Sequence, residues 1–149
     1  MIGLQPLVEL AIMPFCVTLG GRVGFLWLMC IGAAFGVAAN ICFATTANAL
    51  GMFAGQILMG GVWGIFASLG IIAAQRLLPT AVATASAIFM SSTAVGSALG
   101  GLTGALGVAT VGLPEIFFIP AAFAFLAVFG LGAMARSGTL KTGPAGDSM

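Results

Sequence analysis

Five apolar stretches dominate this 149-residue sequence, and each is long enough to cross a lipid bilayer. A helix needs about 20 apolar residues to span the hydrocarbon core. Hydrophobic residues make up 61% of the chain and charged residues 5%, which leaves too little polar surface for a water-soluble domain of this length. Lipid offers the backbone no hydrogen-bond partner, and the stretches show no alternation of polar and apolar residues. The sequence therefore predicts an all-α integral membrane protein with about five transmembrane helices.

The predicted spans are separated by short breaks, so consecutive helices should lie side by side and antiparallel. Together they form one transmembrane helical domain, residues 1–136. The spans cover about residues 2–19, 24–44, 52–75, 81–108 and 116–135. Residues 137–149 are polar and contain Gly and Pro, which predicts a disordered tail.

The basic residues are all predicted on one side of the membrane. Arg22 lies in the first break and Arg76 in the third, whereas Arg136 and Lys141 follow the last span. Glu115, in the fourth break, is predicted on the opposite side. Because cytoplasmic loops carry an excess of Lys and Arg, this pattern places the C-terminal tail in the cytoplasm.

Several classes of function are excluded by what the sequence lacks. It contains no histidine, which removes Ser-His and Cys-His catalytic pairs and His-based zinc sites. Cys16, Cys30 and Cys42 lie far apart inside apolar stretches, so we interpret them as small buried hydrophobic residues. The net charge of +1 offers no basic patch for nucleic acid. We expect no enzymatic activity, no cofactor, no metal site and no nucleic-acid partner.

Glu9 is the one acidic residue inside a predicted span. A carboxylate at the centre of a bilayer costs about 2.5–3.5 kcal/mol on insertion scales, so such residues usually face the bundle interior or a water-filled cavity and mark an ion or substrate path. Glu9 is therefore our candidate for proton coupling. The alternative is an ordinary surface acid near the headgroups, because Glu9 lies close to the start of the chain.

Other polar or aromatic residues in the spans are candidates for a substrate path. Amides are costly to bury, and hydroxyls can line a hydrophilic path, although they can also bond to carbonyls of their own helix. A tryptophan in mid-span either packs in the core or forms a cavity wall that could stack on a sugar ring. The candidates are Asn40, Gln56, Trp63, Gln75, Ser92 and Thr93.

Glycines recur every four residues in the third and fourth spans. This spacing places them on one helix face, where small residues let two helices approach closely in lipid. Such a face is either a static packing surface or one along which helices slide during a transport cycle. The predicted helix-packing residues are Gly60, Gly64, Gly96, Gly100 and Gly104.

Six short segments carry a resemblance to a known family. They are residues 8–9 (VE), 20–24 (GGRVG), 55–58 (GQIL), 74–79 (AQRLLP), 83–86 (ATAS) and 95–96 (VG). In these segments the chain resembles the C-terminal half of major facilitator superfamily carriers, and most closely the sugar efflux transporter group. The resemblance covers about residues 1–136 and makes the five spans helices eight to twelve. Two positions depart from it: Arg76 stands where the group tends to have an acid, and Ala94 where it tends to have an arginine.

The resemblance implies a partial major facilitator superfamily bundle, the C-terminal fragment of a secondary transporter that works by alternating access around a site at the membrane midplane. The implied activity is proton-coupled efflux, as an antiporter, of sugars or related small molecules from a bacterial inner membrane. Its partners would be the bilayer, the substrate, and either the missing N-terminal bundle or another copy. Two alternatives stay open: a small self-contained dimeric exporter of the multidrug type with Glu9 as its coupling acid, and a structural membrane subunit without transport activity.

Overall fold

The computed structural model describes residues 3–137, and these residues form five long helices and one short 3-10 turn without any strand. All five helices are long and apolar enough to cross a membrane. The prediction of an all-α membrane chain is confirmed. The predicted tail lies outside the described residues from position 138 onwards. The elements are α1 (Leu4–Val23), α2 (Phe25–Thr45), α3 (Ala49–Leu77), α4 (Val82–Thr110), η1 (Glu115–Phe117) and α5 (Phe118–Ser137).

The helix boundaries differ most from the predicted spans in two places. The first break was expected over residues 20–23, but α1 continues through these residues and Gly24 alone separates it from α2. Gly24 has a φ of 99°, a left-handed conformation that glycine adopts without steric cost and that lets the chain reverse. α3 begins before the predicted residue 52 because the Asn48 side chain accepts a hydrogen bond from the Gly51 amide at 2.9 Å.

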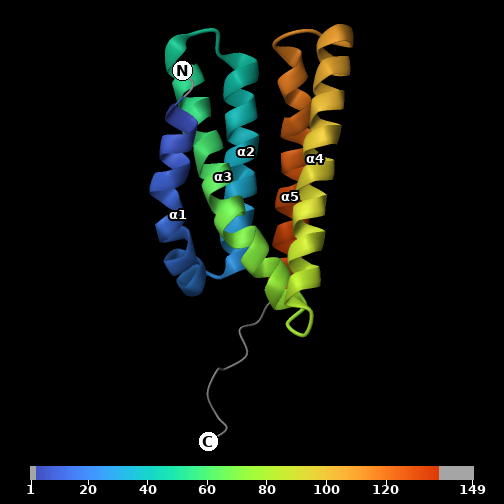
Figure 1. The fold of residues 1–149 in the computed structure, drawn as a ribbon. Helices are drawn as coiled ribbons and strands as arrows, with labels where there is room; N and C mark the ends of the chain where they lie inside the picture. The colour runs from blue at the N-terminus through green and yellow to red at the C-terminus, as the bar shows by residue number, and fades with distance from the viewer. Residues whose placement is uncertain (1–2, 138–149) are drawn as a thin grey trace, which may run out of the picture.

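α2 is the central helix of the bundle (Figure 1). It packs against α3 on one side and α5 on the other, and α1 packs against α3. α4 contacts α3 near its own start and η1 near its end. α1, α3 and α5 run in the same direction, and α2 and α4 run in the opposite one.

The core lies between α1, α2 and α3, near the end of the bundle where α1 and α3 finish. Its buried residues are Cys16, Phe25, Leu28, Met29, Ile65, Leu69 and Ala73. The Arg76 guanidinium carbon lies 4.1 Å from the centre of the Phe25 ring, a cation–π contact that joins the end of α3 to the start of α2.

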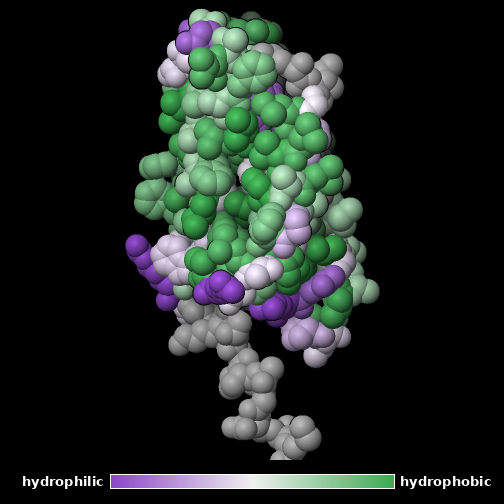
Figure 2. Space-filling model, turned by 90° about the vertical axis from the view of Figure 1, so that its left-hand side faces the viewer, coloured by the Kyte–Doolittle hydropathy of each residue, from purple (hydrophilic) through white to green (hydrophobic). Residues whose placement is uncertain are grey.

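The outer surface is apolar over most of the helix length. Figure 2 shows hydrophobic residues covering the middle of the molecule, with hydrophilic residues gathered at its two ends. Large side chains such as Leu10 and Phe15 are about two-thirds exposed. A surface of this kind suits lipid rather than water.

The three arginines of the described residues and Glu115 lie at opposite ends of the bundle. Arg22, Arg76 and Arg136 occupy the last turns of α1, α3 and α5, which finish at the same end of the bundle. Glu115 lies at the other end, in the turn between α4 and α5.

Candidate functional site

Glu9 lies at the depth of the middle of α3. A Cβ atom placed on Gly64 would be 3.3 Å from the Glu9 backbone oxygen, and Gly64 is close to the midpoint of Ala49–Leu77. α1 begins at the level of Gly60, where Gln5 and Val8 make the corresponding contacts. Since α3 is long enough to cross the bilayer, Glu9 lies far from both ends of the bundle.

Glu9 also shares a helix face with the buried residues of α1. Cys16 and Gly20 follow it by seven and eleven positions, which places all three on one side of the helix. Cys16 is 2% exposed and Gly20 is buried. Leu7 and Leu10, on the remaining surface of α1, are exposed to 65% and 68%. The Glu9 position therefore belongs to the side of α1 that faces the bundle.

The Glu9 side chain is half-buried and has no hydrogen bond or ion pair with any other residue in the 3–137 range. Its basic counterparts in this range, Arg22, Arg76 and Arg136, lie at the end of the bundle. Within the described range, the Glu9 carboxylate is therefore not paired with another side chain.

Two of the candidate amide side chains, Asn40 and Gln75, form hydrogen bonds within the bundle. Asn40 is 6% exposed, and its Nδ2 donates to the Gly36 carbonyl of the same helix at 2.8 Å. Gln75 Nε2 donates to Ser86 Oγ at 2.9 Å, which joins the end of α3 to the start of α4. Both side chains stabilise the helices that they contact.

The remaining path candidates do not converge on a common site. Ser92 and Thr93 are exposed on α4, and their hydroxyls donate at 2.7 Å to carbonyls of α4 itself. Gln56 is half-buried on α3. Trp63 is 49% exposed, so it is part of neither the core nor a closed cavity wall within residues 3–137.

The five predicted packing glycines divide into two groups. Gly60 and Gly64 are buried and lie against α1, as the small-residue spacing predicts. Gly96, Gly100 and Gly104 have no neighbouring atom within 4 Å of an added Cβ. The packing role predicted for these three is not seen in the described part of the chain, because α4 contacts its neighbours only near its ends.

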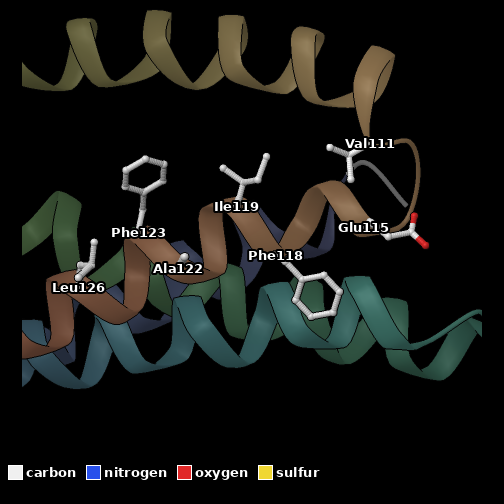
Figure 3. Close-up of a pocket in the computed structure, with 7 residues that line it drawn as sticks. All are labelled: Val111, Glu115, Phe118, Ile119, Ala122, Phe123 and Leu126. Carbon is white, nitrogen blue, oxygen red and sulfur yellow. The ribbon is translucent and has the colours of Figure 1, made fainter.

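An open groove lies between α4 and α5 where the glycines of α4 were expected to pack. One hollow of about 610 Å³ is lined from both helices. A second hollow, also of about 610 Å³, lies beside it and is lined by α5 and the preceding turn (Figure 3). The two share Ile119 and Phe123, which point towards α4. The first hollow is lined by Gly96, Leu99, Gly100, Thr103, Gly104, Ile116, Phe117, Ile119, Pro120 and Phe123.

The groove could not be found from the sequence, because apolar side chains that line a hollow look the same as those that face lipid. The glycine spacing of α4 marked one wall of it, but as a packing surface. None of Glu9, Gln75 and Ser92 lines either hollow.

No metal site is apparent among residues 3–137, where no three His, Cys, Asp or Glu side chains lie together. Cys16, Cys30 and Cys42 are free thiols. The Cys30 thiol donates to the Val128 carbonyl at 3.4 Å and so joins α2 to α5. Cys16 is part of the core, so these two thiols contribute to helix packing.

Comparison of the chain with protein-family models, with curated proteins and with solved structures finds no match.

Proposed function

We propose that this chain is the C-terminal portion of a secondary transporter, related to the major facilitator superfamily, that exports sugars or similar small molecules in exchange for protons. The observation that carries the proposal is the position of Glu9: level with the middle of α3, on the inward side of α1 and without a partner in the described range. A carboxyl group at this depth is costly, and such groups usually face the bundle interior or a water-filled cavity and mark an ion or substrate path. Alternating-access carriers hold such groups near the midplane.

Proton exchange at Glu9 gives the carrier a coupling mechanism. In the outward-open state of this proposed carrier, the carboxylate accepts a proton and becomes neutral. The neutral group crosses to the inward-open state at a lower desolvation cost than the charged one. It then releases the proton on the inner side, and the cycle continues with the outward movement of substrate.

The exposure of α4 supports a role as part of a larger assembly. Among its residues Ala85 and Gly107 are buried, and its middle turns are exposed throughout. A bundle with an open wall of this size cannot close a substrate site by itself. We therefore propose that an N-terminal bundle completes the carrier. A second copy in a small dimeric exporter is the alternative that the same exposed wall favours.

Replacement of Glu9 by glutamine tests the proposal. Glu9→Gln would be introduced into the complete carrier or oligomer and reconstituted in proteoliposomes with a pH-sensitive dye inside. A panel of radiolabelled mono- and disaccharides would serve as substrates. We expect sugar efflux driven by a pH gradient to be lost, because the amide cannot carry a proton. Sugar exchange at equal pH should persist, since it requires no net proton movement.

Two further variants control this experiment. Thr18→Val removes a polar, exposed side chain from the same helix and should keep the coupling. Glu9→Asp keeps a carboxyl group at this position and should retain part of the proton coupling. Unchanged proton movement in Glu9→Gln would remove this residue from the mechanism and would leave the proposed function without its main support.

A further inference from the structure

The groove between α4 and α5 has the dimensions of a lipid site. The wall lined by residues from 115 to 126 runs through η1 and the start of α5 and extends for about 18 Å, at about 2.0 Å per residue in the 3-10 turn and 1.5 Å in α5. One leaflet of the hydrocarbon core is about 15 Å deep. The groove begins at the end of the bundle that lacks the arginines and runs towards the middle, so it follows one leaflet.

The lining of the groove suits an acyl chain. Val111, Phe118, Ala122 and Leu126 surround the second hollow together with the shared pair Ile119 and Phe123. Figure 3 shows Ile119, Phe123 and Leu126 standing in a row along the side of α5 that faces α4. In the adjoining first hollow, Gly96, Gly100 and Gly104 of α4 leave open space in place of side chains. An unbranched apolar chain fills such a trough without leaving a buried polar group unpaired.

The charge at the mouth of the groove selects the headgroup. Glu115 lies at the end of the row, with its carboxylate directed away from the apolar side chains (Figure 3). It is exposed and has no ion pair within the described chain. Arg22, Arg76 and Arg136 are at the far end of the bundle. A headgroup whose only charge is its phosphate would therefore meet a carboxylate without a compensating cation, whereas a zwitterionic headgroup would offer its ammonium to Glu115.

We propose that the groove between α4 and α5 binds a phospholipid with a primary ammonium headgroup, with an acyl chain along α5 and the ammonium beside Glu115. A primary ammonium donates hydrogen bonds to a carboxylate, and a trimethylammonium has no hydrogen to donate. The site thus favours ethanolamine over choline and glycerol headgroups. This inference rests on the transmembrane fold and does not depend on the proposed transport activity.

Native mass spectrometry of the detergent-solubilised chain tests the site. The probes are phosphatidylethanolamine, phosphatidylcholine and phosphatidylglycerol with identical acyl chains. We expect the ethanolamine lipid to bind about three- to fivefold more tightly than the other two, as for a partly exposed ion pair. Glu115→Gln should abolish the preference, and Glu115→Lys should transfer it to phosphatidylglycerol. A misfolded variant could not produce that reversal.

Two other variants separate the headgroup from the acyl chain. Ala122→Phe fills the groove and should weaken the binding of all three lipids without changing their order. Glu9→Gln, the matched loss of a carboxylate elsewhere, should leave the preference for ethanolamine unchanged. Equal affinity for the three headgroups, or a preference that survives Glu115→Gln, would overturn the proposal. Dimers that dissociate in Ala122→Phe, without selective lipid binding, would overturn it in favour of a helix from a second copy.

Discussion

Glycines with the same spacing have different surroundings in α3 and α4. At Gly60 an added methyl group would lie 2.7 Å from Val8 Cβ and 2.8 Å from the Gln5 backbone oxygen. These distances are too short for ordinary packing, and the backbone oxygen cannot move without shifting α1. At Gly96 an added methyl group meets nothing within 4 Å. Glycine is therefore required at Gly60 for helix contact, and at Gly96 it is not.

Alanine substitution should separate these two glycines. We expect Gly60→Ala to lower the free energy of unfolding by about 1–3 kcal/mol, because α1 must move away from α3. Gly96→Ala should leave stability unchanged or raise it by up to about 1 kcal/mol, through the higher helix propensity of alanine. Titration of the micelle-bound chain with denaturing detergent, followed by circular dichroism, measures both. Equal destabilisation by the two variants would contradict the packing assigned to α1 and α3.

At the scale of the elements, α4 is the helix least integrated into the bundle. Its start contacts α3 through Phe89, which lies against Gly70, and through the hydrogen bond between Gln75 and Ser86. Its end contacts η1, where Ile116 lies against Gly107. Between these points α4 stands apart from α5 across the groove. The few side chains at its start therefore determine its position on α3.

A double-mutant cycle should detect the link between α3 and α4. We expect Gln75→Leu and Ser86→Ala to show a coupling energy of about 0.6 kcal/mol, the average for polar contacts between membrane helices. Ser92 serves as the control, because its hydroxyl donates to Phe89 of its own helix. Ser92→Ala combined with Gln75→Leu should be additive. The same denaturing-detergent titration measures the free energy of unfolding of all these variants. Absence of coupling between Gln75 and Ser86 would mean that their hydrogen bond does not stabilise the packing of α4 on α3.

At the scale of the whole molecule, the arginines and Glu115 are separated along the bundle axis. The helices that end in arginine finish at one end, and the turn that carries Glu115 lies at the other. A bundle that spans a membrane in this way has one basic face, and on the positive-inside rule we propose that this face is the cytoplasmic one. The connections between helices should therefore be accessible from alternate sides.

Labelling of introduced cysteines with a membrane-impermeant maleimide tests this topology. The three native cysteines would first be replaced by alanine. We expect Thr80→Cys, in the turn between α3 and α4, to react only after cells are permeabilised. Ala47→Cys and Leu113→Cys, in turns at the other end, should react in intact cells. Labelling of positions 47 and 80 from the same side would rule out a spanning bundle.

The amino-acid sequence alone determined the fold class, the number of helices and the packing role of Gly60 and Gly64, but not the helix against which they pack. These follow from local properties: the length of apolar stretches fixes which segments cross lipid, and the spacing of Gly60 and Gly64 gives one helix face without side chains. It also singled out Glu9, because a carboxylate in an apolar stretch is visible without any structure. The substrate-path candidates were predicted from residue type, and the structure assigns Asn40 and Gln75 to hydrogen bonds within the bundle.

The tertiary structure decided what depends on the relative placement of helices. The depth of Glu9 is set by its contact with Gly64 on another helix, and no property of residues 4–23 specifies that level. The surroundings of the α4 glycines also depend on helix placement. Gly96, Gly100 and Gly104 have the same spacing as the packed glycines of α3, but they face an open groove. A small-residue face permits close approach without requiring it, so the partner of such a face is decided by the packing of the other helices.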